Sequence, residues 1–131
     1  MNRLFAIILF VFISGCQSSR ISTCENYFES CNKRTQFPTC EELSYSNPRN
    51  SDFSFPTRFL VGEIDSAEVR KHIDETPFLI NEFITEAKDA ESFWYYDASG
   101  KDDSGMYIGT EGVIALKDCT ILSSFPIIIY N

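Results

Sequence analysis

The chain has 131 residues, of which 44% are hydrophobic and 15% aromatic, which is enough for the core of one domain. Its 19 acidic and 11 basic residues give a formal net charge of −8. A charge of this sign repels nucleic acid phosphates, and the sequence has no cluster of Lys and Arg, so we expect no nucleic acid partner. Apolar residues are concentrated at the N-terminus, and no later run is long enough to cross a bilayer.

The first sixteen residues have the layout of a secretory leader. A short basic start precedes a ten-residue apolar run over 4–13, which is too short to span a membrane as a helix. The run ends in Ile13-Ser14-Gly15-Cys16, which resembles the lipobox of bacterial lipoproteins. The resemblance implies that residues 1–15 are a signal peptide and that Cys16 carries a diacylglycerol thioether and an acylated amine. The protein would then be anchored to a membrane through its lipid, since more than one acyl chain gives stable anchoring.

The residue after the lipobox cysteine influences sorting in that family, where an aspartate tends to retain the protein in the inner membrane. Gln17 stands at this position, so the resemblance implies the periplasmic side of the outer membrane, with the inner membrane as the alternative. Residues 16–23 would be the lipidated cysteine and a short tether, and residues 24–131 a single domain. Because Arg3 leaves with the signal peptide, the net charge would change from −8 to −9.

Four cysteines remain for the domain, and an even number in an exported chain predicts two disulfides. They are Cys24, Cys31, Cys40 and Cys119. The spacings Cx6C and Cx8C and the single histidine do not fit a zinc site, so we expect neither a metal nor a cofactor.

Two S/T-x-x-E patterns, starting at Ser22 and Thr39, predict a helix over 24–34 and a short second helix from 40 to about 45. On the first helix, the Cα atoms of Cys24 and Cys31 would lie about 10.5 Å apart, too far for a disulfide. Two pairings therefore stay open. A helical hairpin favours Cys31–Cys40 with Cys24–Cys119, and the alternative is Cys24–Cys40 with Cys31–Cys119.

The middle of the chain predicts a loop over 47–57, a short strand over 58–64 and two helices. Asp65 and Glu68 form a capping pattern at the start of the first helix. Val69, His72 and Ile73 share a face of it. Pro77 suits the start of the second helix, over 77–89. Its apolar stripe is Leu79, Ile80, Phe83, Ile84 and Ala87.

The last third predicts strands over 92–97, 106–109, 113–117 and 120–130, with Asp118-Cys119 at a hairpin tip. Pro126 predicts an edge or a bulge in the last strand. The apolar run 127–129 is prone to cross-β pairing, so we expect the helix pair to cover it. The elements together predict an α+β two-layer fold, in which a short N-terminal helical hairpin and a helix pair pack on a small antiparallel sheet of 3–4 strands.

No pattern identifies catalytic residues. His72 is the only imidazole, no nucleophile motif accompanies it, and it is expected to be a half-buried packing or surface residue. Asp97, Asp102, Asp103 and Glu111 could gather near a turn, but a glycosidase would also need a deep cleft in a larger scaffold. The stretch 97–105 does not match a calcium-binding loop, which favours a polar hairpin loop. We therefore predict that the protein is not an enzyme.

The most informative stretch for binding is Phe93-Trp94-Tyr95-Tyr96. In a strand these aromatic side chains alternate, so one pair packs under the helices and the other lies beneath more chain or is exposed. If exposed, the pair and nearby carboxylates would form a recognition surface. That candidate surface consists of Trp94, Tyr96, Asp97, Asp102 and Asp103.

The resulting hypothesis is a non-enzymatic, lipid-anchored cell-envelope protein that binds a periplasmic or outer-membrane protein. The alternative is a small acidic inhibitor or immunity-type protein that neutralises a basic enzyme or toxin, which the negative charge and the stapled fold favour.

Overall fold

The structure is a computed structural model that describes residues 23–32, 36–47, 54–76 and 81–131. The expected signal peptide, Cys16, nearly all of the tether and the start of the second expected helix at Pro77 lie outside the described residues. Within the described ranges, no helix has the length and apolar character needed to span a membrane.

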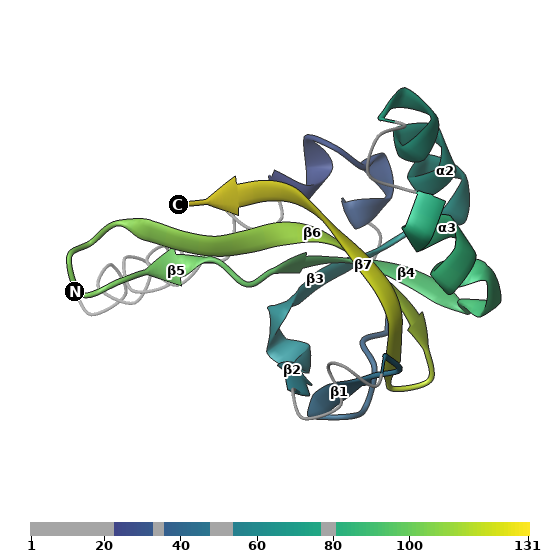
Figure 1. Ribbon diagram of the computed structural model, residues 1–131, viewed down its shortest axis with the longest axis horizontal. Coiled ribbons are helices and arrows are strands. Elements are labelled where there is room, and N and C mark those ends of the chain that lie inside the picture. Colours follow the sequence, from purple (N-terminus) through teal and green to yellow (C-terminus); the bar gives the residue numbers. More distant parts are fainter. Residues whose placement is uncertain (1–22, 33–35, 48–53, 77–80) are drawn as a thin grey trace, which may run out of the picture.

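The described chain consists mainly of strands (Figure 1). The strands are β1 (Glu42–Tyr45), β2 (Ser54–Pro56), β3 (Leu60–Ile64), β4 (Ser92–Asp97), β5 (Gly100–Lys101), β6 (Tyr107–Lys117) and β7 (Thr120–Tyr130). The helices are α2 (Ser66–Glu75) and α3 (Asn81–Glu86), and the 3-10 turns are η1 (Glu29–Asn32), η3 (Thr57–Phe59) and η5 (Ala87–Asp89).

The strands form one curled, mixed sheet of seven strands. Its order is β2-β1-β7-β6-β4-β3, with β5 added to β6. β1 and β7 are parallel, and the other described pairs are antiparallel. The three-residue turn η3 joins β2 to β3, which stand at opposite ends of that order, so the sheet has to curl until its ends lie close together. The result is a half-barrel (Figure 1), and the expected two-layer fold on an antiparallel sheet of 3–4 strands is wrong.

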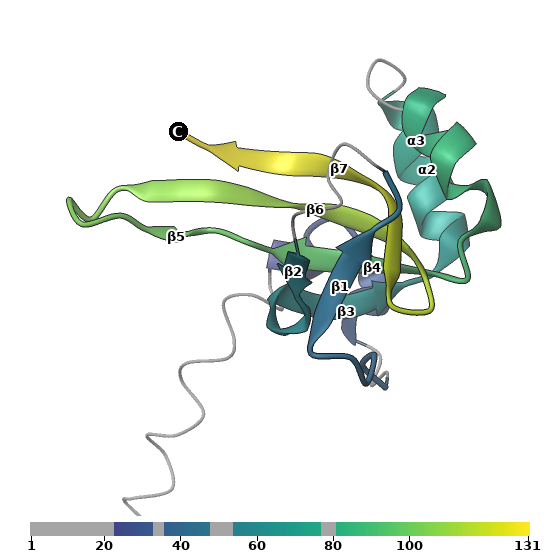
Figure 2. The same ribbon diagram turned by 60° about the horizontal axis from the view of Figure 1, so that its bottom comes forward.

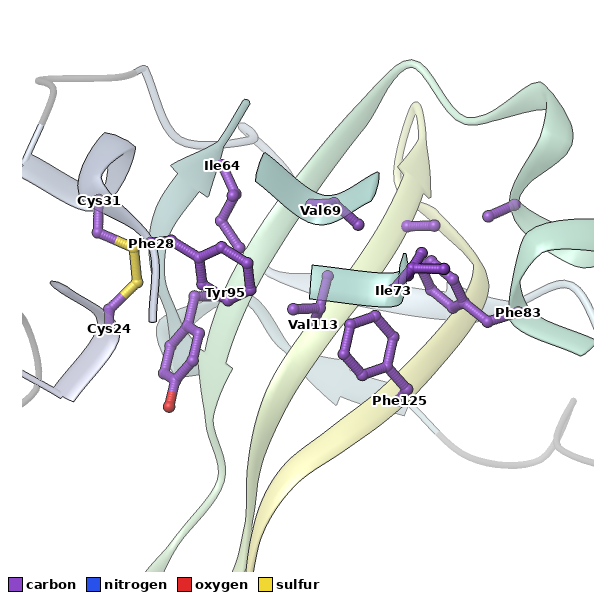
Figure 3. Packing of buried hydrophobic residues seen from close by; sticks show 12 residues of the cluster. Cys24, Phe28, Cys31, Ile64, Val69, Ile73, Phe83, Tyr95, Val113 and Phe125 are labelled. Atoms are coloured by element: carbon purple, nitrogen blue, oxygen red, sulfur yellow. A yellow bond between two sulfur atoms is a disulfide. The ribbon is translucent and has the colours of Figure 1, made fainter. Parts of the chain in front are cut away.

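The curl gives the sheet two buried faces. Strand side chains fill the inside of the half-barrel, and these are Leu43, Phe55, Leu60, Trp94, Tyr96, Ile114, Leu116 and Ile121. The outer face is covered by the N-terminal segment, α2 and α3 (Figure 3), where Phe28, Val69, Ile73 and Phe83 pack against Tyr95, Val113 and Phe125. Residues 111–116 of β6 are buried throughout, because both faces of the strand are covered.

The N-terminal segment is not the helix expected over 24–34. Only 23–25 are helical before the chain turns into η1, which brings the Cα atoms of Cys24 and Cys31 to 6.0 Å, and the two cysteines form a disulfide. The second disulfide joins Cys40 and Cys119, whose Cα atoms lie 6.3 Å apart. The prediction of two disulfides among these four cysteines is confirmed, but both expected pairings are wrong.

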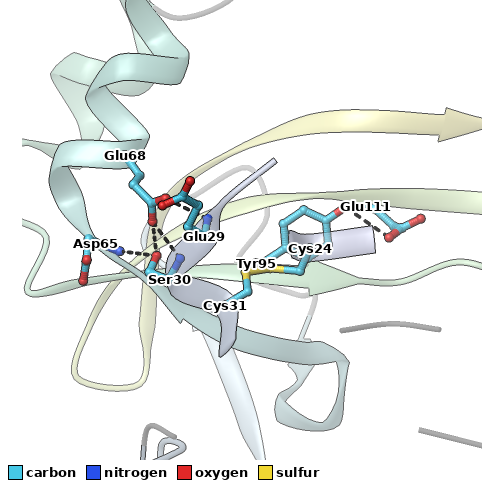
Figure 4. Close-up of a disulfide and its surroundings, with 8 residues drawn as sticks. All are labelled: Cys24, Glu29, Ser30, Cys31, Asp65, Glu68, Tyr95 and Glu111. Carbon is cyan, nitrogen blue, oxygen red and sulfur yellow. Dashed lines mark hydrogen bonds between the residues drawn. A yellow bond between two sulfur atoms is a disulfide. The ribbon is translucent and has the colours of Figure 1, made fainter. Parts of the chain in front are cut away.

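The reason is a contact with α2 (Figure 4). The carboxylate of Glu68 accepts hydrogen bonds from the backbone N–H groups of Glu29, at 2.7 Å, and Ser30, at 3.0 Å, and from the Ser30 hydroxyl. These donors belong to the stretch that was expected to be helical. The tertiary contact therefore outweighs the local helix signal.

The short helix expected from 40 to about 45 is also wrong, since those residues contain β1. Leu43 is fully buried inside the half-barrel, between flanking residues that are exposed. Other predictions are confirmed. β3, α2, β4 and β7 lie where expected, and Asp118-Cys119 forms the turn between β6 and β7. The pairing of β7 with β6 skips Ile127 next to Pro126, which is the predicted bulge.

Close approach of two strands requires the glycine at position 112. A Cβ atom built there would lie 2.1 Å from the carbonyl oxygen of Phe125 on β7. We expect Gly112→Ala to lower the free energy of unfolding by about 3 kcal/mol, because the strands would have to separate. Urea denaturation measures this change. The control is Gly100→Ala, where a Cβ atom meets nothing within 4 Å, and equal stability of the two variants would contradict the prediction.

Candidate partner-binding surface

The aromatic pair of the predicted recognition surface is buried. Trp94 is 3% exposed and Tyr96 is 6% exposed, because β1 and β2 cover the inner face of β4. The Phe55 ring of β2 stands edge-on to Tyr96 with 5.5 Å between the ring centroids, and the indole N–H of Trp94 donates to the Ser92 hydroxyl at 2.9 Å. Asp97 is also buried. The expectation that these three residues form an exposed surface is therefore wrong.

The other two predicted residues, Asp102 and Asp103, are exposed in the turn between β5 and β6. The Asp102 carboxylate accepts hydrogen bonds from the hydroxyl of Ser104, at 2.6 Å, and from the backbone N–H of Met106, at 3.1 Å. These bonds, led by that of Ser104, hold the pKa of Asp102 below its ordinary value. The loop is thus a self-bonded polar turn, as expected, and does not join Trp94 and Tyr96 in one site.

A different surface is exposed at the far end of the sheet. β4 pairs only with residues 111–116 of β6, so the first residues of β6 extend beyond it, together with β5 and the end of β7. We call residues 100–110 and 128–131 the arm, and Figures 1 and 2 show it projecting from the body of the protein. Four large apolar side chains of the arm are each between 46% and 60% exposed, and we call them together the arm patch. They are Met106, Tyr107, Ile108 and Ile129. They lie on both faces of the arm, because Ile108 and Ile129 share one face and Tyr107 lies on the other.

The arm patch corrects one expectation directly. Residues 127–129 were expected to lie under the helix pair, but Ile129 is exposed on the arm. The side chain of Phe83 on α3 packs instead against Phe125, with the ring centroids 4.7 Å apart. The helices therefore cover β7 before its apolar run and leave the end of the run in solvent.

A buried carboxylate fastens the arm to the body. Glu111 is 2% exposed, and its two oxygen atoms accept hydrogen bonds from the phenols of Tyr95, at 3.1 Å, and Tyr130. Burial and the neighbouring Glu111 raise the pKa of Tyr95, and the hydrogen bond to Glu111 raises the pKa of Tyr130 to about 12. Both phenols therefore remain protonated donors, and they connect β4, β6 and β7 where the arm begins.

The Tyr130 ring continues this connection onto the arm, since its centroid lies 5.8 Å from that of Tyr107. Glu111 also faces Asp97 across the pair of strands, so two of the four carboxylates expected to gather do lie together. Asp97 accepts from the backbone N–H of Ser99 at 2.9 Å and from its hydroxyl.

His72 packs as expected, half-buried on α2. Its ring stacks on Phe125 with 5.8 Å between centroids, and burial lowers its pKa. Among the described residues, no group of three or more His, Cys, Asp or Glu side chains is placed to hold a metal ion. A cleft of 560 Å³ lies between α2 and the α3–η5 segment, with charges of both signs at its rim, so it favours neither an anionic nor a cationic ligand.

The arm patch was missed in the sequence, although a signal was present. Met106, Tyr107 and Ile108 are consecutive, and side chains in a strand point alternately to opposite faces. A core on one side cannot bury all three, so at least one of them had to be exposed or covered by further chain.

No family model, no curated protein and no solved structure matches this chain. The case for its function therefore rests on its own residues.

Proposed function

We propose that the protein is a non-enzymatic, lipid-anchored cell-envelope protein that binds a protein partner through the arm patch. The observation that carries the proposal is that four large apolar side chains, on both faces of one short projecting arm, are exposed. Clustered apolar side chains in solvent are typical of interaction surfaces, and aromatic residues and Met are enriched at the centres of interfaces.

The base of the arm supports this proposal. The hydrogen bonds from Tyr95 and Tyr130 to the buried Glu111 fix the directions of β6 and β7 where they leave the body. A surface held in place before it meets a partner loses less conformational entropy on binding.

The anchor belongs to the proposal through the lipobox resemblance of Ile13-Ser14-Gly15-Cys16. A lipid on Cys16 would keep the arm at the membrane surface, where an envelope partner is concentrated. Incorporation of labelled palmitate that disappears in Cys16→Ser tests this part of the proposal, and equal labelling of both proteins would refute it.

Cross-linking in the native host tests the surface. We expect Ile108→Ser and Tyr107→Ser to reduce the yield of the cross-linked complex about tenfold, since truncating a central interface side chain typically costs more than 1 kcal/mol. The matched control is Ile84→Ser, because Ile84 is 51% exposed on α3 and lies away from the arm. Loss of the complex in the control alone, or in none of the variants, would contradict the proposal.

Salt distinguishes this function from neutralisation of a basic enzyme or toxin. An interface centred on apolar side chains loses little affinity as ionic strength rises, even with one ion pair at its edge, whereas an interface based mainly on charge complementarity weakens steeply. Complex formation measured at low and high salt separates the two.

A further inference from the structure

β7 has a long edge without a strand partner among the described residues. β1 pairs only with its first two residues, in the register Ser44↔Thr120 and Tyr45↔Ile121, and the backbone N–H of Ser46 then donates to the Ile121 carbonyl at 2.9 Å. From Ser123 onward, no strand of the described chain pairs with this side of β7. The whole of Thr120–Tyr130 is also uncharged. Native proteins usually protect such an edge with charge or cover, because it can template the pairing of another strand.

A groove of 240 Å³ opens at the point where β1 leaves this edge. It lies between the end of β1, the α3 helix and residues 121–124 of β7, and Glu82 and Glu86 are among the residues that line it. Glu86 accepts a hydrogen bond from the Ser123 hydroxyl at 2.6 Å. α3 therefore places negative charge beside the first unpaired residues of the edge.

We propose that an extended, Lys- or Arg-containing segment of the protein partner adds to β7 as a further strand beyond Ile121. Its backbone pairs with the edge, and a basic side chain enters the groove beside Glu82 and Glu86. Strand addition obtains affinity from main-chain hydrogen bonds and specificity from the pockets that receive side chains. The inference rests on the proposed function and names the chemistry of the partner.

Charge and edge geometry favour this occupant over a second copy of the chain. Two copies would each bring a net charge of −8, whereas a basic segment complements it. The pairing of β7 with β6 skips Leu122 and Ile127, and Pro126 has no N–H to donate. These interruptions confine regular pairing to a short stretch and oppose the stacking of identical edges.

Peptide titration tests the backbone part of the inference. The probe is a synthetic peptide in which valine and lysine alternate, added to the intact protein. We expect it to bind at least about tenfold more tightly than a proline–lysine peptide of equal charge, which lacks alternate N–H donors. Hydrogen exchange should slow at the amides of 123–125, the stretch between the two interruptions in β7. Equal affinities, or slowing elsewhere in the chain, would overturn the inference, and slowing at β7 on concentrating the protein alone would assign the edge to a second copy.

Matched variants test the charge part. We expect Glu82→Gln to weaken binding of the valine–lysine peptide about threefold, as for a partly exposed ion pair, and Asp89→Asn on η5 to leave it unchanged. A valine–glutamate peptide should bind least. If Glu82→Gln binds the valine–lysine peptide as tightly as Asp89→Asn does, and the valine–glutamate peptide also binds equally well, the carboxylate groove has no role and the basic partner is ruled out.

The two proposals fail separately. Tyr107 and Ile108 lie on β6, away from the free edge of β7. We therefore expect the Tyr107→Ser and Ile108→Ser variants to bind the peptide normally and to lose the cross-linked complex. If the complex depends on the arm but the peptide does not bind, only the strand-addition inference is wrong. If the peptide binds but the complex does not depend on the arm, only the arm proposal is wrong.

Discussion

Removing the Cys40–Cys119 disulfide should lower the free energy of unfolding by about 4.5 kcal/mol, and removing Cys24–Cys31 by about 2.4 kcal/mol. The first bond closes a separation of 79 residues and the second a separation of 7. In the chain-entropy model, the longer loop restricts the unfolded chain more, so its loss increases the entropy of that state more.

The contacts around the Cys40–Cys119 disulfide also predict that its removal has the larger effect on stability. Cys119 lies at the tip of the β6–β7 hairpin, and its carbonyl accepts a hydrogen bond from the backbone N–H of Ser44 at 3.0 Å. The disulfide therefore holds β1 against β7, where only two residues of each strand pair. Without it, we expect β1 and β2 to separate from the sheet more readily.

Urea denaturation of two double alanine variants measures the difference. Alanine is used because Cys24 is fully buried and a serine hydroxyl there would add its own desolvation cost. A larger loss for the Cys24–Cys31 pair would mean that burial of these sulfur atoms outweighs loop closure and would refute the predicted ranking.

Replacing Glu111 by alanine should lower the free energy of unfolding by about 4 kcal/mol, because each hydrogen bond to a charged group contributes about 1.5–3 kcal/mol. The substitution leaves the phenols of Tyr95 and Tyr130 without their acceptor. Glu111→Gln should cost only about 1 kcal/mol, since an amide can accept from one phenol and donate to the other.

The control for this substitution is Asp103→Ala, which removes an exposed carboxylate from the arm and should leave stability unchanged. Denaturation gives the free energies, and hydrogen exchange should show faster opening of the arm amides in Glu111→Ala. If Glu111→Gln is as damaging as Glu111→Ala, the charge of the acceptor matters more than the pair of hydrogen bonds.

The sequence predicted the last third of the fold better than the first. β4 and β7 lie at the expected residues, because alternating and β-branched side chains in them reflect faces that are buried locally. The N-terminal segment could not be predicted in this way. The helix signal in this segment is local. The hydrogen bonds that keep the segment out of a regular helix come from Glu68, which is 38 residues from Ser30 along the chain.

The same limit applies to β1 and to the candidate site. Leu43 belongs to a strand because β1 pairs with β7 across the length of the domain, and no local pattern records that partner. The alternation in β4 was predicted correctly, but Trp94 faces inward because the sheet curls, and the curl depends on a connection of three residues between β2 and β3. The sequence identified the aromatic side chains and could not tell which face would be covered.

The position of β7 has a consequence for biogenesis. Among the described strands this one comes last along the chain, yet it lies in the middle of the sheet, between β1 and β6. The sheet therefore cannot be completed until Thr120–Tyr130 is available to pair with β1. The Cys40–Cys119 bond cannot form before that point either. Contacts this distant along the chain slow folding. The order of the strands in the sheet therefore delays completion of the β1–β7 pairing until the final hairpin has been synthesised.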